Sequence, residues 1–311
     1  MNEKERMKKL IKIINDAAEV YYNTGEEKMP NIEYDKLYDE LEALEKSSGI
    51  ILSDSPTQRA GTDVKNNIAK ITHEYPALSL AKTKDISLFP KTFAVRDNKA
   101  IVMWKEDGGT LVATYDNGKL SSLATRGNGI IGQDITQNAK YIHGLPLGLP
   151  FKTHFVVRGE ALMSYKEFER VNNALPSDVE PYKNPRNLAN STVSLDAEKE
   201  LEHREIWFHA FKLVYNESDY TVTRPRTFYG DMEFLKSLGF ETTEHVLCDV
   251  SDIESVIREM SDRVSKYAFP VDGLVVAAND VVQNPEEVGN ALRVVAMRIR
   301  GAKTELEDAG E

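Results

Sequence analysis

The sequence predicts an α+β protein in which a small N-terminal helical module precedes a larger domain with mostly antiparallel sheets. Apolar residues recur at helical spacing over residues 3–22 and again over residues 31–46. From about residue 71 the pattern changes to short β-rich runs that alternate with helical segments. The turn Asp116-Asn117-Gly118 between two of these runs is typical of a β-hairpin, and hence of antiparallel pairing.

We expect residues 1–68 to form the helical module. The first helix carries its apolar stripe on Leu10, Ile14, Ala17, Ala18 and Tyr21. The second helix follows Pro30, with Asn31 as its predicted N-cap, and carries its buried face on Tyr34, Leu37, Tyr38, Leu41 and Leu44. Residues 50–68 are rich in Pro, Ser, Gly and Asn, which predicts a linker. Because two helices bury little core, the module is expected to dock on another part of the protein.

The second domain is expected over residues 69–311. Its predicted strands lie near 100–104, 110–115, 119–125, 154–158, 206–213 and 272–278. Its predicted helices lie at 132–142, 165–173, 228–238 and 251–265.

Composition restricts the class of protein. The 311 residues include 29% charged and 41% hydrophobic residues, which excludes collagen-like and wholly disordered chains. No apolar run approaches the ~18 residues of a membrane helix, and the charged start does not resemble a secretory signal, so we expect no membrane partner. A single cysteine, Cys248, argues against a disulfide framework and favours a reduced, cytoplasmic setting. The net charge of −11 lacks the basic footprint that nucleic-acid-binding proteins usually show.

The first candidate for chemistry is Lys105-Glu106-Asp107-Gly108, directly after an apolar run. A lysine that leaves a buried strand can be desolvated, which lowers its pKa and frees the amine as a nucleophile. Asp107 would project to the same side and orient the amine or a metal, and the glycines that follow would let the backbone approach a ligand. The alternative is a surface turn at the end of a strand.

Four further motifs carry charged residues at predicted strand ends or turns. Arg126-Gly127 between a strand and a predicted helix suits anion binding, and Glu160 at a strand end suits ribose hydroxyls or a metal. Arg186 lies in a rigid Asn184-Pro185-Arg186-Asn187 turn, and Asp272 enters a buried strand, which is costly unless it is paired. Taken singly, each motif is also compatible with an ordinary turn, cap or salt bridge.

The order of these motifs resembles that of the covalent nucleotidyltransferases, which include DNA ligases, RNA ligases and mRNA capping enzymes. The segments 34–37, 55–59, 78–80, 124–127, 134–138 and 184–187 are similar to motifs of bacterial NAD-dependent DNA ligases, and the resemblance runs from about residue 5 to about residue 300. It implies a nucleotidyltransferase domain of the ATP-grasp-like ligase and capping-enzyme fold. A helical N-terminal module is characteristic of the branch that uses NAD.

The resemblance also implies roles for individual residues. Lys105 would attack the α-phosphate of NAD and keep AMP, and nicotinamide mononucleotide would leave. Arg126, Arg186 and Mg²⁺ would meet the charge on the phosphate, Glu160 would hold the ribose, and Asp107 and Asp272 would orient the lysine or engage the metal. Cofactor contacts are expected also from Leu78 and Ser79 near the adenine, Arg298 in the last motif, and Tyr21, Tyr22, Tyr34 and Asp35 in the helical module. The AMP would then pass to the 5′-phosphate of nicked DNA.

Several positions depart from the family pattern. Met103 and Ala277 stand where the family has a glutamate and a lysine that contact the nucleotide, and Arg298 stands for a lysine. Tyr22 and Asn31 replace residues that contact the nicotinamide half. These changes leave two alternatives open: a catalytically impaired homologue that binds a nucleotide or a partner, and a nucleotidyltransferase with another donor or acceptor, such as ATP or an RNA end.

The chain is also short for a complete ligase of this family. We expect domains absent from this chain to make most of the contact with nicked duplex DNA, which would account for the acidic charge. The chain is expected to act as a monomer and not to seal nicks unaided.

Overall fold

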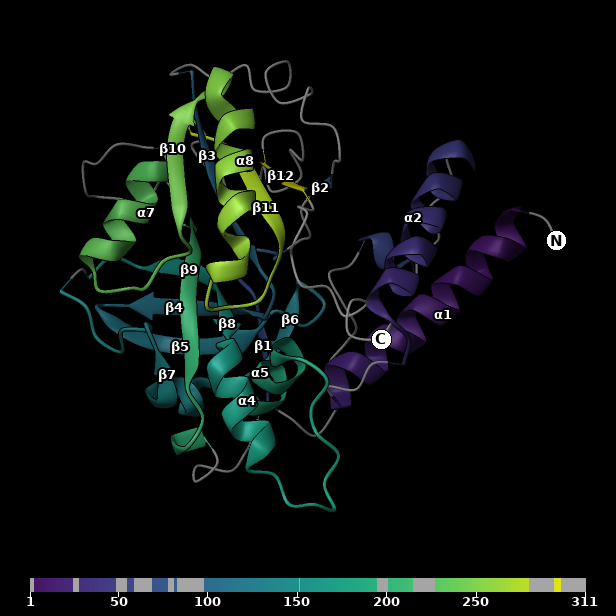
Figure 1. Cartoon of the computed structure of the whole chain (residues 1–311), viewed down its shortest axis with the longest axis horizontal. Helices are drawn as coiled ribbons and strands as arrows, with labels where there is room; N and C mark the ends of the chain where they lie inside the picture. The colour runs from purple at the N-terminus through teal and green to yellow at the C-terminus, as the bar shows by residue number, and fades with distance from the viewer. Residues whose placement is uncertain are drawn as a thin grey trace.

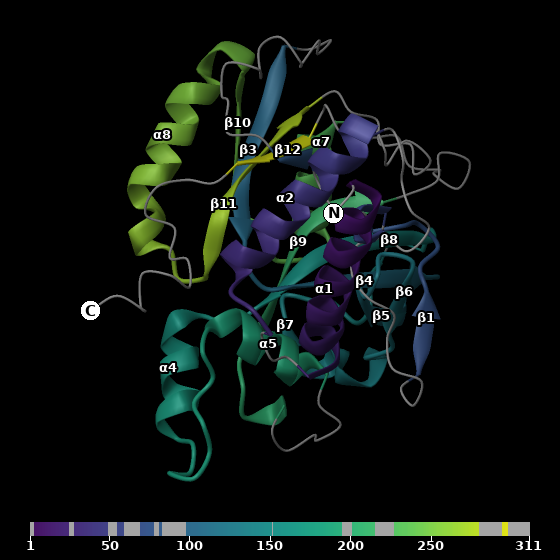
Figure 2. The same cartoon turned by 90° about the vertical axis from the view of Figure 1, so that its right-hand side faces the viewer.

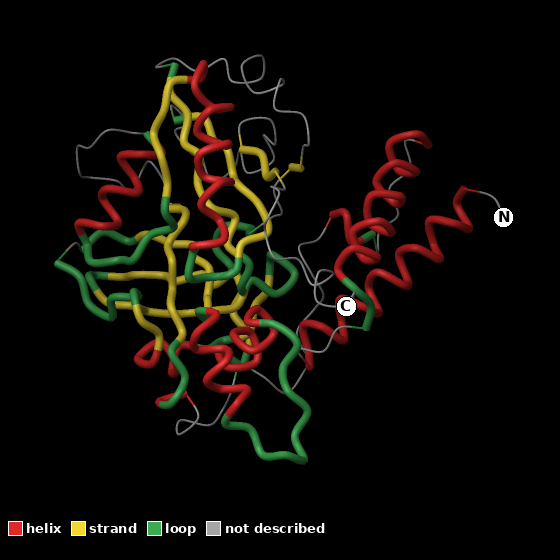
Figure 3. Tube along the Cα trace, viewed as in Figure 1, coloured by secondary structure: helices red, strands yellow, loops and turns green. Residues whose placement is uncertain are grey.

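The computed structural model describes residues 3–24, 28–48, 55–58, 69–77, 81–82, 98–150, 152–194, 201–214, 227–279 and 294–297. Figure 1 and Figure 3 show a pair of N-terminal helices beside a larger body built on two sheets. Among the described residues, no helix is long and apolar enough to cross a membrane.

The two predicted N-terminal helices are confirmed. Helices α1 (Glu3–Thr24) and α2 (Asn31–Ser48) pack side by side, as Figure 2 shows. Their core consists of Met7, Leu10, Ile11, Ile14 and Leu41, with Tyr34, Leu37, Tyr38 and Leu44 packed against it. The predicted N-cap lies one residue too late, because the carbonyl of Pro30 accepts from the amides of Glu33 and Tyr34, and Asn31 is already helical.

The described part of the predicted linker packs against α2. The short 3₁₀ helix η1 (Pro56–Gln58) follows Ser55, whose hydroxyl donates to the Glu45 carboxylate at 2.5 Å. Thr57 Oγ1 donates to the same carboxylate at 2.6 Å. Glu45 is 6% exposed, so these two hydroxyls stabilise a buried charge and fasten the chain to the helices. The remainder of the predicted linker lies outside the described residues.

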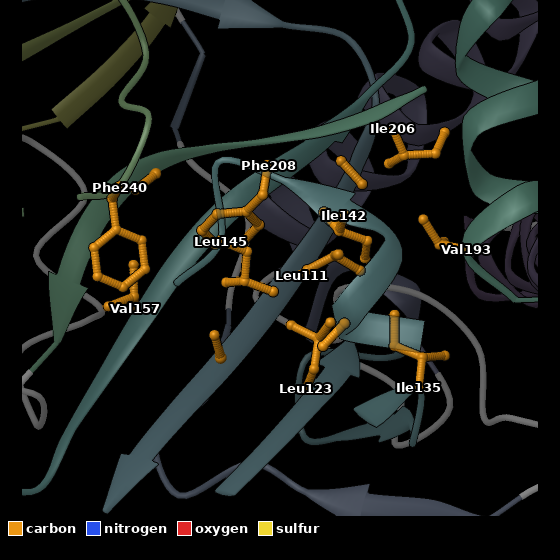
Figure 4. Packing of buried hydrophobic residues seen from close by; sticks show 14 of the residues in the cluster. Leu111, Leu123, Ile135, Ile142, Leu145, Val157, Val193, Ile206, Phe208 and Phe240 are labelled. Atoms are coloured by element: carbon orange, nitrogen blue, oxygen red, sulfur yellow. The ribbon is translucent and has the colours of Figure 1, made fainter. Parts of the chain in front are cut away.

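The first five-stranded sheet has the order β5-β4-β8-β9-β7. Its strands are β5 (Lys119–Thr125), β4 (Gly109–Asp116), β8 (Phe155–Leu162), β9 (Ile206–Val214) and β7 (Ile142–His143). All neighbours are antiparallel except β7 and β9. Figure 4 shows part of its core, a single cluster that includes Leu111, Leu123, Val157, Phe208 and Phe240.

The second five-stranded sheet has the order β10-β3-β11-β12-β2. Its strands are β10 (His245–Asp249), β3 (Lys99–Glu106), β11 (Val271–Ala278), β12 (Val294–Met297) and β2 (Ala81–Lys82). Only β12 and β2 are parallel. A separate pair, β1 (Lys70–Thr72) with β6 (Ile131–Gln133), is antiparallel. The prediction of mostly antiparallel sheets is therefore confirmed.

Strand β3 is buried on both faces, which explains its continuous apolar run. One face packs under helix α8 (Ile253–Arg263) and presents Val102 and Trp104. The other face presents Ile101 and Met103 to helix α7 (Phe228–Ser237). Helices α4 (Tyr165–Asn173) and α5 (Pro185–Val193) lie in the lower part of the body in Figure 1, below α7 and α8.

The predicted strands near 100–104, 110–115, 119–125, 154–158, 206–213 and 272–278 are confirmed as β3, β4, β5, β8, β9 and β11. Three predicted helices are confirmed as α4, α7 and α8, the last with the 3₁₀ turns η5 (Val250–Asp252) and η6 (Val264–Lys266) at its ends.

The predicted helix at 132–142 is wrong. The segment forms β6, the 3₁₀ helix η3 (Thr136–Tyr141) and the start of β7. Asp134 Oδ1 accepts from the amide and the hydroxyl of Thr136, which closes a tight turn at the point where an α-helix would begin. The amide of Ile135 donates to the Leu123 carbonyl of β5, so tertiary pairing takes the place of a helical bond.

Candidate functional site

The site lies where the chain passes from one sheet to the other. β3 of the second sheet runs through Asp107 and Gly108 directly into β4 of the first sheet. Lys105 stands near the end of β3, and β11 brings Gly273 opposite it. In the first sheet, Glu160 of β8 stands opposite Thr110 of β4. Strand ends from both sheets therefore present charged side chains at one corner.

Lys105 is paired with Asp272. Lys105 Nζ lies 2.7 Å from Asp272 Oδ1 and 2.5 Å from Oδ2. The register between β3 and β11 shifts between Val271 and Gly273, so Asp272 is the extra residue of a β-bulge, a feature that re-aims a side chain. The expected desolvation of the lysine is not what the structure shows, because 33% of its side chain is exposed where β3 reaches the corner. The expectation that Asp272 needs a partner is met by Lys105.

Asp107 is paired with Arg186, whose Nη1 donates to Oδ1 of the carboxylate. The amide of Asp107 donates to the Pro270 carbonyl at 2.8 Å, which ties this connection to the segment before β11. Arg186 stands in the first turn of α5, so the predicted rigid turn is instead a helix start. Asn184 caps that helix by accepting from the Asn187 amide at 2.8 Å. An asparagine followed by proline is a recognised helix start, so the sequence did carry this signal.

Glu160 lies among cations. Its carboxylate accepts from the Gly108 amide at 3.2 Å and from Thr110 Oγ1 at 3.0 Å. Burial raises the pKa of Glu160 to about 7, while the positive charges of Arg186, Arg126 and Lys105 act in the opposite direction. Glu160 therefore lies within range of the positive charges of Arg186, Arg126 and Lys105. Thr110 was missed at the sequence level, because a single threonine at the start of a strand has no distinctive pattern.

Arg126 lies between β5 and β6, and its amide donates to the Thr110 carbonyl at 2.9 Å. The following loop is a tight turn with positive φ at Gly127 and Gly129, and Asn128 Oδ1 accepts from two amides of the turn. The turn leads into a strand rather than a helix, so the helix N-terminus expected for anion binding is absent at this place. Of the two features predicted to bind an anion here, the Arg126 guanidinium near Glu160 is present.

The glycines after Asp107 serve the protein's own packing. A Cβ on Gly108 would lie 2.1 Å from the Ala161 carbonyl oxygen, and a Cβ on Gly109 would lie 1.8 Å from Asn190 Oδ1. Close approach to β8 and α5 therefore requires glycine at both positions, and the expectation that these glycines also admit a ligand stays a prediction.

Arg158, two residues before Glu160 in β8, holds the segment that contains Tyr75 and Pro76. It is 4% exposed and donates to the carbonyls of Tyr75 and Pro76 at 3.0 and 2.9 Å. Burial lowers the pKa of this guanidinium to about 10. Its role here is structural.

The other predicted cofactor residues are not brought to this corner by described contacts. Tyr34 packs on the core of the helical module and stacks on Tyr38 at 6.2 Å, and Asp35 lies in the same helix. The side chains of Tyr21 and Tyr22, and all of Leu78, Ser79 and Arg298, lie outside the described residues.

Two positions that depart from the family pattern are apolar packing positions. Met103 is 2% exposed and Ala277 is fully buried. Both join Ile101 and Val275 in a cluster that packs against α7. A side chain of the opposite polarity at either position would have to displace this packing.

The described residues contain no group of three or more His, Cys, Asp and Glu side chains placed to hold a metal ion. The carboxylates of Asp107, Asp272 and Glu160 each have protein partners instead.

Comparison with known proteins agrees with this geometry. Residues 65–294 match the family model of the NAD-dependent DNA ligase adenylation domain, and residues 1–61 match that of the DNA ligase-like N-terminal NAD⁺-binding domain. The DNA ligase of Lachnoclostridium phytofermentans is 38% identical over 90% of this chain and 42% of its own length. The DNA ligase of Ruminiclostridium cellulolyticum is 37% identical over 92% of this chain and 43% of its own length. The chain thus spans less than half the length of these relatives.

Similarity to solved structures is weaker. A mycobacterial DNA ligase D complexed with ATP and MES is 16% identical, with a TM-score of 0.38 over 70% of this chain and 60% of that chain. An archaeal ATP-dependent RNA ligase is 12% identical, with a TM-score of 0.41 over 72% of this chain and 48% of that chain. On the family-model match and the identity to bacterial DNA ligases, the chain belongs to the NAD-dependent DNA ligase adenylation domain family.

Proposed function

We propose that this chain performs the first step of NAD-dependent DNA ligation, in which Lys105 takes the AMP of NAD. The observation that carries the proposal is the gathering of Lys105, Asp272 and Glu160 with two arginines at the corner between the sheets. A nucleophile, a proton acceptor and cations for a phosphate are what a nucleotidyl transfer to lysine requires. We place the boundary between the helical module and the adenylation domain near residue 68, which the two family-model ranges support.

The reaction needs the free amine of Lys105. A proton of the ammonium group passes to the Asp272 carboxylate, the nearest acceptor at 2.5 Å. The amine nitrogen then forms a bond to the α-phosphorus of NAD. The bond from that phosphorus to the bridging oxygen breaks, and nicotinamide mononucleotide leaves with that oxygen.

The arginines stabilise the charge that develops on the transferred phosphate. Arg186 is held by Asp107 and by its place in the first turn of α5, so its orientation is set before substrate binds. Arg126 supplies a second cation from the turn after β5. Glu160, with Thr110 donating to it, is the acceptor for the ribose hydroxyls.

We also propose Mg²⁺ as the metal of the reaction. Mg²⁺ at nucleotide sites is bound by one or two carboxylates together with substrate phosphates, so no protein cage is needed. Asp107 is the partly exposed carboxylate of the corner that would supply the protein ligand, while Asp272 stays the proton acceptor of Lys105. When bound, the ion would neutralise phosphate charge. The AMP would then pass to nicked DNA in the cytoplasm. Contacts with the duplex would come mainly from regions that correspond to the parts of the related ligases outside the matched span.

The test is covalent labelling with NAD that carries ³²P in its AMP half. After incubation with Mg²⁺ and denaturation, the protein is expected to retain label that acid removes, as a P–N bond requires. Lys105→Ala abolishes the label. Lys99→Ala is the matched control, because Lys99 lies in the same strand and pairs with Asp249 at 2.9 Å. Labelling from ATP alone, or from neither donor in a folded protein, would overturn the proposal.

A further inference from the structure

Glu106 lies between Lys105 and Asp107 in the sequence. Its side chain is buried on the face of β3 opposite to that of Lys105. Successive side chains of a strand alternate, so Glu106 points away from Lys105 and Asp107. Only 2% of its side-chain surface is exposed. Nothing in the adenylation chemistry described above uses this carboxylate.

Three side chains from three separate segments donate to Glu106. His209 Nδ1 of β9 lies 2.6 Å from Oε1, and the hydroxyl of Tyr267 lies 2.6 Å from the same oxygen. Thr243 Oγ1 donates to Oε2 at 2.8 Å. A carboxylate so far out of water is stable only because such donors replace its hydration.

The donors tie the two sheets together at the site. His209 belongs to the first sheet, and the amide of Thr243 donates to the Ala210 carbonyl of the same strand before the chain enters β10 of the second sheet. Tyr267 follows α8 and packs on the Trp104 ring at 5.2 Å. Glu106 therefore connects the end of β3 with both sheets through its own two oxygens.

The same network holds the strand that carries Asp272. Tyr267 lies five residues before Asp272. Phe269 in this stretch packs edge-on against His209 at 4.7 Å, and Val271 stands opposite Glu106 in the β3–β11 register. The bulge that aims Asp272 at Lys105 begins at that same register position. Fixing Glu106 thus fixes both partners of the Lys105–Asp272 pair.

We infer that Glu106 is a positioning residue for adenylation, which sets the alignment of Lys105 with Asp272 through His209, Thr243 and Tyr267. The inference rests on the proposed function. It predicts an effect on the rate of AMP transfer rather than on NAD binding, because Glu106 does not face the site.

The variant Glu106→Gln removes the charge while it keeps the size of the side chain. At saturating NAD, the rate of lysyl-AMP formation is expected to fall about 10- to 100-fold, since a displacement of about 1 Å costs up to that much. The KM for NAD is expected to change less than about threefold, because ground-state binding is untouched. Glu106→Asp keeps the charge and should retain more of the rate than Glu106→Gln.

Glu167→Gln is the matched control. Glu167 is 5% exposed and bonds to Arg170 and to the Glu205 amide, neither of which is among the residues of the corner. It is expected to lose thermal stability as Glu106→Gln does and to keep the rate. If Glu106→Gln matches Glu167→Gln in rate, the inference is overturned.

A second measurement does not depend on NAD. Pulse acetylation with acetic anhydride, read by peptide mass spectrometry, reports the reactivity of the Lys105 amine. Glu106→Gln should change the acetylation rate of Lys105 and leave that of surface Lys236 unaltered. If the wild-type protein forms no lysyl-AMP, the proposed function fails. The inference is tested separately: it is overturned if Glu106→Gln leaves the acetylation rate of Lys105 unchanged. Should Glu106→Gln not fold, Tyr267→Phe removes one donor only, and normal values in both assays would count against the inference.

Discussion

The substitution Asp272→Asn should separate catalysis from stability. The Lys105–Asp272 pair is short, with both carboxylate oxygens within 2.7 Å of Nζ, but its side chains are 33% and 25% exposed. A partly exposed pair contributes only about 0–1 kcal/mol to stability, so the loss should be small. Asparagine keeps the size of the side chain and cannot take the ammonium proton. Losing such a proton acceptor typically costs about 10²- to 10⁴-fold in rate.

The assay is single-turnover labelling from ³²P-NAD, run beside urea unfolding of the same preparations. Asp249→Asn is the matched control, because Asp249 pairs with Lys99 at the other end of β3. It should match Asp272→Asn in stability and wild type in rate. If Asp272→Asn retains a rate within about threefold of wild type, Asp272 is not the proton acceptor and the reasoning is refuted.

Three further predictions concern pH and packing. Because burial raises the pKa of Glu160 from its ordinary value of 4.5 to about 7, the folded protein keeps a proton that the unfolded chain has lost. The free energy of unfolding should therefore fall as pH rises between these two values, and Glu160→Gln should flatten that fall in urea titrations; an equally steep fall in the variant would contradict the assignment. Gly159→Ala would place a Cβ 2.3 Å from the Phe208 ring, so we expect a loss of about 1–3 kcal/mol in unfolding free energy. Gly148→Ala, where the nearest atom is 3.9 Å away, should be much milder, and equal losses would refute the steric argument. Ser55→Ala removes a donor from the buried Glu45 carboxylate and should cost about 1–3 kcal/mol. Ser47→Ala removes an exposed hydroxyl that donates to the Leu44 carbonyl within α2; it should cost much less by thermal unfolding, and similar values would contradict the account of the Ser55–Glu45 contact.

Local pattern was sufficient for much of the fold. The stripe through Leu10 and Ile14 predicted a helix that the structure has, and the apolar run at 100–104 predicted β3. Pattern failed at 132–142, where Asp134 and pairing with β5 override helical spacing. The start of α5 was missed although Asn184 and Pro185 signal it.

The candidate site was predictable in its membership but not in its contacts. Lys105 and Asp272 are 167 residues apart, and only the β3–β11 register with its bulge brings them together. No spacing in the sequence shows that Arg186 pairs with Asp107, or that Gly108 is required by the Ala161 carbonyl. No sequence pattern indicates the buried contacts of Glu106, because its partners His209, Thr243 and Tyr267 come from three distant segments.

The most direct measurement is the location of AMP on the protein. After incubation with NAD and Mg²⁺, tandem mass spectrometry of the digested chain should place one adenylate on Lys105 and on no other lysine. An adenylate on a different residue, or an unmodified Lys105 in protein shown to be folded, would contradict the account.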